Sequence, residues 1–142
     1  MEQPEDLCVD ASVLVKWFVV EEGRAAALAV RDHAEAGAAL WLPASWSLEL
    51  TSGLYHKVRE GTMTLEEARR QLAEALHTLA LVTPLEEVVQ PALELSARFR
   101  TSVWDAVYLV VALDHDAHFF TADRELYRKV SSSLPRIHLV SW

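Results

Sequence analysis

The stretch LCVDASVLVKWF, residues 7–18, joins two apolar segments through an aspartate and two small residues. Leu7–Val9 has the composition of a short buried strand, and a helix is expected from about Ser12. Asp10 lies at the corner between them, where an aspartate can cap the helix by accepting hydrogen bonds from the amides of its first turn. A single aspartate of this kind is an ordinary cap, so its meaning depends on whether the arrangement recurs.

The rest of the chain alternates short apolar segments with helical ones. Further strands are predicted at residues 39–43 (ALWLP), 81–83 (LVT), 118–121 (HFFT) and 137–140 (IHLV). Helices are predicted at residues 24–37, with Gly37 as the stop, at 44–60, with Gly61 beyond the end, and at 103–113. Another covers much of residues 86–100, where Pro91 marks either its start or a kink. Two more are expected to begin after the Thr64/Glu67 capping box and after Asp123. Such alternation is typical of a parallel sheet covered by helices on both faces. We therefore expect an α/β fold, a three-layer α/β/α sandwich with a mostly parallel central sheet.

Composition narrows the classes of protein further. With 142 residues, 51% of them hydrophobic, the chain is expected to form one domain spanning residues 1–142. No apolar run approaches the roughly 18 residues of a membrane span. The first residues are acidic, unlike the basic start of a secretory signal. A single cysteine suits a reducing compartment. We expect a cytoplasmic protein with no membrane partner. The net charge of −8 argues against a general nucleic-acid coat protein, but not against an enzyme that reaches nucleic acid through bound cations.

Four carboxylates are expected at one edge of the predicted sheet, where sites of open parallel sheets form. They are Asp10 after the first strand, Asp123 after HFFTA, Asp105 in the first turn of the buried helix, and Glu49 one turn into the helix after the second strand. Each has an ordinary explanation as a cap or a solvated helical residue. Together they would repel one another, and bound Mg²⁺ or Mn²⁺ would remove that repulsion. A metal site is the better joint explanation.

The order of VDAS, PASWSLELTSGL, SVWDAVYLVVAL and FFTADREL resembles the PIN-domain ribonucleases, particularly the VapC-type toxins of toxin–antitoxin pairs. The resemblance covers essentially the whole chain. It implies that Asp10, Glu49, Asp105 and Asp123 bind Mg²⁺, with Mn²⁺ as a substitute, and catalyse endonucleolytic hydrolysis of RNA. It also implies a homodimer and a cognate antitoxin. The family often has Asn three residues after the glutamate, where this chain has Ser52.

Other polar residues are secondary candidates. Ser12, Ser52 and Thr121 are expected to orient the acids or a bound water. Lys16 and Arg124 are candidates for holding phosphates, and Arg124 is the better placed because it follows Asp123. An acidic cleft would also attract a guanidinium or ammonium group, so the inhibitory segment of the antitoxin is expected to be basic.

Two alternative functions stay open at this stage. One is a metal-dependent phosphatase of another α/β family, although haloacid-dehalogenase-like enzymes generally need a second aspartate where this chain has Ser12. The other is a non-catalytic PIN-like interaction module, against which the presence of all four acids argues. The RNA target, the identity of the antitoxin and the number of metal ions are not determined by the sequence.

Overall fold

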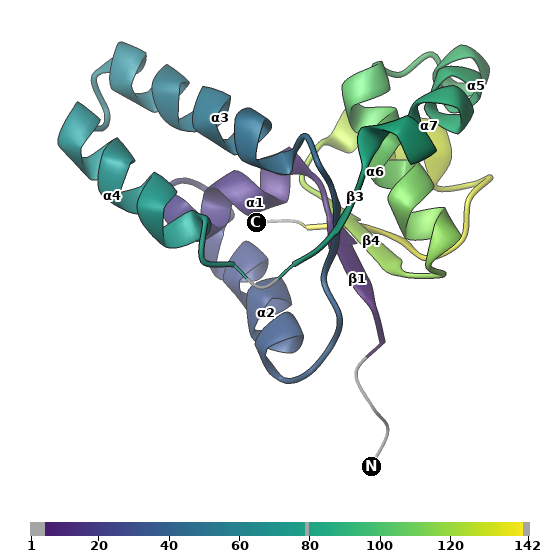
Figure 1. Ribbon diagram of the computed structural model, residues 1–142, viewed down its shortest axis with the longest axis horizontal. Helices are drawn as coiled ribbons and strands as arrows, with labels where there is room; N and C mark the ends of the chain where they lie inside the picture. Colours follow the sequence, from purple (N-terminus) through teal and green to yellow (C-terminus); the bar gives the residue numbers. More distant parts are fainter. Residues whose placement is uncertain (1–4, 79, 141–142) are drawn as a thin grey trace.

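The computed structural model describes residues 5–78 and 80–140, and within them five parallel strands form the centre of the molecule (Figure 1). A bridge between Leu7 and Leu40 joins a two-stranded and a three-stranded part. In spatial order the strands are β3 (Leu81–Thr83), β2 (Trp41–Pro43), β1 (Leu7–Val9), β4 (His118–Thr121) and β5 (Ile137–Leu139). All described pairings are parallel, so the carboxyl ends of the strands meet at one edge.

Helices cover both faces of this sheet, as Figure 1 shows. One group comprises α1 (Ala11–Phe18), α2 (Arg24–Glu35), α3 (Trp46–Glu60) and α4 (Leu65–Ala75). The other comprises the 3₁₀ turn η1 (Leu85–Glu87), α5 (Val89–Phe99), α6 (Val103–Asp114) and α7 (Arg124–Val130). The predicted α/β sandwich is confirmed. No helix in the described part of the chain has both the length and the apolar character needed to cross a membrane.

The predicted elements appear in the predicted order, and in the segment 86–100 the first of the two alternatives for Pro91, a helix start, is confirmed. This segment begins as the 3₁₀ turn η1, and the α-helix proper starts at Val89. Pro91 lies in the first turn of α5, where the amides have no partner within the helix, so the missing proline N–H costs little. Pro91 therefore marks the start of the helix and does not interrupt it.

The central helix α6 is buried on nearly all sides, as its composition predicts. Every residue from Ala106 to Ala112 is buried, and the helix contacts β1, β2 and α5. The sulfhydryl of Cys8 in β1 donates to the carbonyl oxygen of Tyr108 at 3.4 Å. The polar residues near the start of α6 are therefore held by a rigid, buried element.

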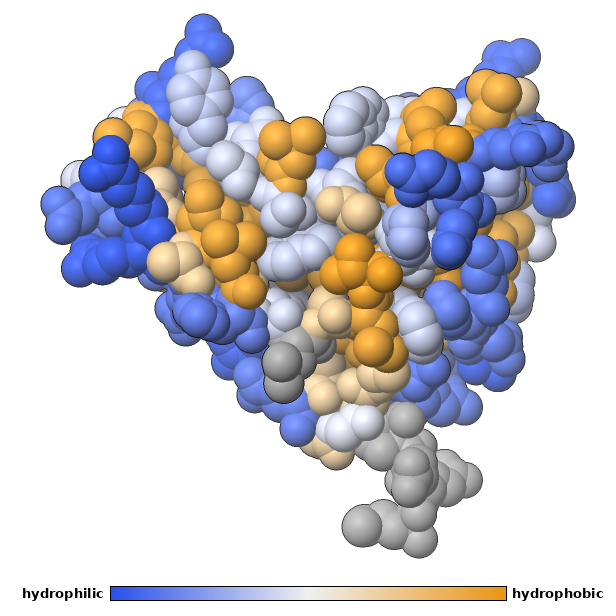
Figure 2. All heavy atoms as spheres, viewed as in Figure 1, coloured by the Kyte–Doolittle hydropathy of each residue, from blue (hydrophilic) through white to orange (hydrophobic). Residues whose placement is uncertain are grey.

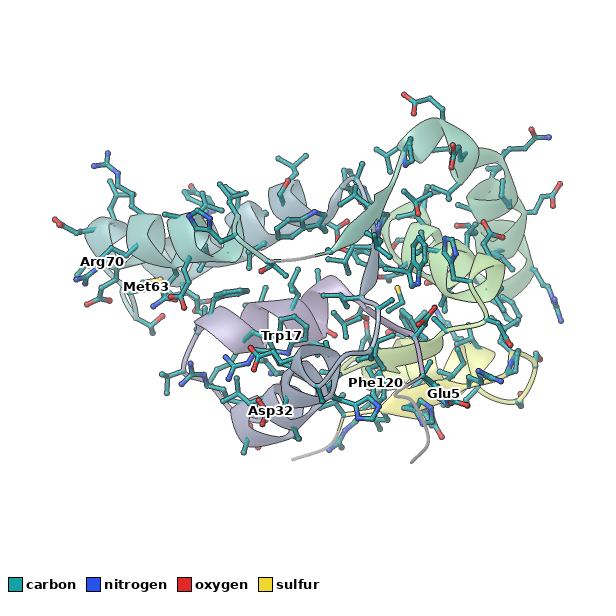
Figure 3. The ribbon with its side chains drawn as sticks, turned by 60° about the horizontal axis from the view of Figure 1, so that its bottom comes forward. Glu5, Trp17, Asp32, Met63, Arg70 and Phe120 are labelled. Carbon is teal, nitrogen blue, oxygen red and sulfur yellow. The ribbon has the colours of Figure 1, made fainter. Side chains whose placement is uncertain are left out.

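Two close contacts pack α1 against its neighbours. Gly53 of α3 lies against Val15 of α1, and a Cβ atom at Gly53 would be only 2.8 Å from Val15 Cγ2. On the other side, the indole of Trp17 points toward α2 and donates to the carbonyl oxygen of Ala27 at 2.8 Å (Figure 3). The absence of a side chain at Gly53 thus lets α3, the helix that carries Glu49, pack closely against α1.

Candidate active site

Asp10 and Asp123 lie at the carboxyl ends of the neighbouring strands β1 and β4, and both cap the helix that follows. An oxygen of Asp10 accepts from the amide of Val13 at 3.3 Å, and Asp123 Oδ1 accepts from the amides of Glu125 and Leu126 at 2.9 and 3.1 Å. The capping interpretation is therefore correct for both residues. It does not compete with a role in binding, because the same turns bring the two aspartates to one edge of the sheet.

Two hydroxyl groups hold the Asp10 carboxylate from opposite sides. Ser12 Oγ donates to Asp10 Oδ1 and Thr121 Oγ1 donates to Asp10 Oδ2, each at 2.5 Å. Each hydroxyl oxygen also accepts a hydrogen bond from a backbone amide of the turn between β4 and α7: Ser12 from Ala122 at 2.9 Å and Thr121 from Asp123 at 3.0 Å. The side chain of Asp10 is only 2% exposed and has a fixed orientation as a result.

Glu49 and Asp105 each come from the first turn of a helix. Glu49 lies in α3 and is half-buried, and its amide donates to the carbonyl oxygen of Ser45 at 3.1 Å. The amide of Asp105 donates to Ser102 Oγ at 3.1 Å, so Ser102 caps α6 as expected. Helix starts of this kind place a carboxylate near partial positive charge.

Electrostatic coupling shows that these acids face one another. Burial and, to a smaller extent, the Asp105 carboxylate raise the pKa of Asp10 from 3.8 to about 6, although the hydrogen bonds from Ser12 and Thr121 lower it. Burial likewise raises the pKa of Glu49 to about 7, with added repulsion from Asp105 and Asp10. The pKa of Asp105 is raised by burial and by Asp123. The four acids thus form one mutually repelling group, reaching from Glu49 through Asp10 and Asp105 to Asp123.

The donor set of this group suits a hard divalent cation. Within residues 5–78 and 80–140, no three His, Cys, Asp or Glu side chains already stand at ligand spacing. However, Glu49 Oε1 is buried without a hydrogen-bond partner among the described residues, and the four acids repel one another. All four ligands would be oxygens, which Mg²⁺ and Mn²⁺ prefer. The residues therefore fit such an ion, which would cancel the repulsion.

The secondary candidates have different surroundings. Ser52 is exposed on α3, one turn beyond Glu49, and Arg124 is exposed at the first position of α7. Lys16 is buried, and its ammonium donates to the carbonyl oxygen of Glu22 at 2.7 Å and pairs with Glu21 at 3.2 Å. A phosphate-binding role for Lys16 or Arg124 stays a prediction.

A small pocket beside the acids is lined by the positively charged side chain of Lys129, which the sequence alone did not single out. This pocket, of about 90 Å³, lies between the start of α6 and α7, and its polar lining includes Asp105, Asp123, Arg100 and Lys129. Lys129 Nζ donates to the carbonyl oxygen of Arg100 at 2.7 Å, and its charge lowers the pKa of Asp105. No local sequence signal marks Lys129, because it reaches the site only through the packing of α7.

The surface around this edge is hollowed between the two groups of helices. In Figure 2 the hollow is flanked by the α3–α4 arm and by the α5–α7 side, and apolar residues gather on both sides of it. Large exposed apolar side chains of these elements include Leu48 of α3 and Val103 and Trp104 of α6. An extended polymer would therefore have apolar as well as charged surface near the acids.

Comparisons with known proteins agree with this architecture. No curated protein sequence matches the chain. The structure is similar to VapC20 of Mycobacterium tuberculosis, described as a sarcin–ricin loop cleaving toxin, with TM-score 0.68, 13% identity, and 92% of this chain and 98% of that chain covered. It is also similar to a toxin–antitoxin complex from Klebsiella pneumoniae, with TM-score 0.59, 16% identity, and 95% and 98% covered. The PIN domain model matches residues 7–131, a span that contains all four acids. The chain therefore belongs to the PIN domain family.

Proposed function

We propose that this protein is a Mg²⁺- or Mn²⁺-dependent endoribonuclease that acts as the toxin of a toxin–antitoxin pair. The observation that carries the proposal is the coupling of Asp10, Glu49, Asp105 and Asp123 at the carboxyl edge of a PIN-domain sheet. Two structural neighbours support it, because one is described as a sarcin–ricin loop cleaving toxin and the other as a toxin–antitoxin complex. Family membership favours this reading over a phosphatase of another α/β fold.

The four acids would share the work of holding metal and substrate. Asp10 is the central ligand, because Ser12 and Thr121 fix both of its oxygens. Asp105 and Asp123 complete the site, while Glu49 either binds a second cation or orients the attacking water. A bound divalent cation supplies Lewis-acid activation of the scissile phosphate and of a water molecule. The expected products carry a 3′-hydroxyl and a 5′-phosphate.

Control of this activity would come from protein partners. A cognate antitoxin would place an Arg or Lys side chain among the four carboxylates, where a guanidinium can pair with oxygens that otherwise bind the cation. Its apolar residues would occupy the hollow between the helical groups. A homodimer and a cytoplasmic location are part of the same proposal. Light scattering at micromolar concentration tests the dimer, and a strict monomer would contradict it.

The experiment that tests the enzymatic proposal is a cleavage assay on purified protein with defined RNA. We expect cleavage with Mg²⁺ or Mn²⁺, none in EDTA, and recovery when the cation is added back. Analysis of the product ends separates a nuclease from a phosphatase, because a phosphatase releases inorganic phosphate from a terminal monoester and leaves the chain intact. A protein that binds neither cation by calorimetry and cuts no RNA would be a non-catalytic PIN module.

A further inference from the structure

Three buried polar atoms beside the acids have no hydrogen-bond partner in the part of the chain that the structure describes: Ser45 Oγ, Glu49 Oε1 and Tyr108 Oη. Ser45 is 5% exposed and Tyr108 is fully buried. Buried hydroxyl and carboxylate oxygens are nearly always paired in folded proteins, because an unpaired one loses its water without compensation. Three unpaired atoms in one place point to an interaction that forms only when the site is occupied.

The helices bring these three atoms together. Ser45 precedes Glu49 by one helical turn, so both lie on the same face of α3. Tyr108 follows Asp105 by one turn of α6, and its backbone is held against β1 by Cys8. Both hydroxyl groups are close enough to lower the pKa of Glu49, although neither is placed with the geometry of a hydrogen bond.

Ser45 is also unusual as a helix-capping residue. It occupies the N-cap of α3, but its side chain accepts no hydrogen bond from the first turn. At the other helix starts of this site, Asp10, Ser102 and Asp123 do cap with their side chains. The backbone of Ser45 has helical dihedral angles (φ −75°, ψ −9°) and not the extended ones of these three caps, so its hydroxyl does not bond the free amides of the first turn. The Ser45 hydroxyl is therefore left available for Glu49.

We propose that Ser45 and Tyr108 are positioning residues that hold one oxygen of the Glu49 carboxylate, so that its other oxygen is presented to a divalent cation. The inference rests on the proposed function and names two residues that act on the site through Glu49. When a cation binds one oxygen of the Glu49 carboxylate, the other oxygen can accept strong hydrogen bonds. The two hydroxyl groups are then its nearest donors. Without them, the buried oxygen would stay unpaired and the carboxylate would turn away from the cluster.

The test compares Tyr108→Phe and Ser45→Ala with the matched controls Tyr55→Phe and Ser47→Ala on the same chain. Tyr55 is exposed, and the side chain of Ser47 caps nothing in the described structure. Calorimetric titration of Mn²⁺ into each metal-free variant measures the affinity directly. We expect Tyr108→Phe and Ser45→Ala to bind Mn²⁺ roughly tenfold or more weakly, the usual size of the effect when a residue behind a metal ligand is lost. The controls should bind as the wild type does.

Two further measurements separate positioning from a general structural role. Thermal unfolding of the metal-free proteins should show Tyr108→Phe as stable as the wild type or more stable, because the lost hydroxyl is unpaired there. With the RNA concentration varied at a fixed, limiting Mn²⁺ concentration, kcat should fall while KM for RNA is unchanged. Ser45→Thr, which keeps the hydroxyl, should recover the Mn²⁺ affinity that Ser45→Ala loses.

The outcomes distinguish this inference from the proposed function. If the wild type binds Mn²⁺ and Tyr108→Phe binds it equally well, the positioning role is wrong and the nuclease proposal stands. If Tyr108→Phe loses metal affinity only in proportion to a large loss of metal-free stability, the role is structural and the inference is again overturned. A wild-type protein that binds no Mn²⁺ overturns both.

Discussion

Thr121 donates a 2.5 Å hydrogen bond to Asp10, although 111 residues separate them in the sequence. The same hydroxyl oxygen accepts from the amide of Asp123 at 3.0 Å. Thr121 is fully buried, so neither interaction is shared with solvent. One side chain at the end of β4 therefore sets the position of the acid that follows β1 and of the acid that follows β4 itself.

Replacing Thr121 by Val should damage both stability and activity. Valine has a similar shape but leaves the buried Asp10 oxygen and the Asp123 amide without this partner, at a cost of roughly 1–3 kcal/mol. Chemical denaturation measures that loss, and RNA cleavage should fall with it because Asp10 is no longer fixed. Thr121→Ser keeps the hydroxyl and is expected to retain most activity. Equal activity of the Val and Ser variants would show that the hydrogen bond is unimportant for cleavage.

Asp10→Asn should abolish RNA cleavage and leave the fold intact. The substitution removes a carboxylate whose buried charge is unfavourable in the metal-free protein, so metal-free thermal stability should be unchanged or higher. Circular dichroism, thermal unfolding and a cleavage assay make the comparison. Asp32→Asn, at an exposed position on α2, is the matched control and should cleave normally. Wild-type cleavage by the Asp10 variant would disprove the assignment of the metal site.

Metal-free stability should decrease as the pH rises. The pKa values of Asp10 and Glu49 are about 6 and about 7 in the folded protein, above their ordinary 3.8 and 4.5. At these two carboxyl groups the folded state therefore binds more protons than the unfolded state between about pH 4 and pH 7, and their contribution to the free energy of unfolding falls with rising pH across that window.

Denaturation of the metal-free protein at about pH 5 and about pH 8 tests this sign. The decrease should be smaller in Asp10→Asn, which isolates the contribution of Asp10 from that of the rest of the chain. Mn²⁺ affinity should change in the opposite direction, increasing as the carboxylates ionise. A metal-free protein that becomes more stable across the same pH range would contradict the raised pKa values.

Gly53→Ala should destabilise the protein despite the higher helix propensity of alanine. Alanine is favoured over glycine in a helix by about 1 kcal/mol. Here its Cβ would meet Val15 Cγ2 at 2.8 Å, and a β-branched side chain in a helix cannot easily rotate away. Overpacking costs roughly 1–3 kcal/mol, so we expect a net loss of about 1 kcal/mol in the free energy of unfolding.

The Val15→Ala background provides the control for this steric explanation. With the valine methyl groups removed, Gly53→Ala should become neutral or stabilising, because only the helix-propensity difference remains. If Gly53→Ala destabilises both backgrounds equally, the contact with Val15 is not the cause.

The secondary structure followed from local signals. The Thr64/Glu67 capping box, Gly61 after α3 and the apolar composition of α6 act within a few residues, and all three appear as predicted. The convergence of Asp10 and Asp123 was also predictable, because carboxyl ends of parallel strands share an edge whatever the strand order. The segment 86–100 was less clear, because a proline allows both a start and a kink.

The sequence by itself determined the α/β class, the order of elements and the edge at which the acids meet, because periodicity, caps and strand direction are local properties. Only the tertiary structure decided the strand order, the pairing of Thr121 with Asp10, and the approach of Tyr108 and Ser45 to Glu49. It likewise brought Lys129 of α7 to the carbonyl oxygen of Arg100. These contacts join residues that are distant in the chain, and they depend on how close-packed helices and strands fill the core. No short stretch of sequence encodes that packing by itself.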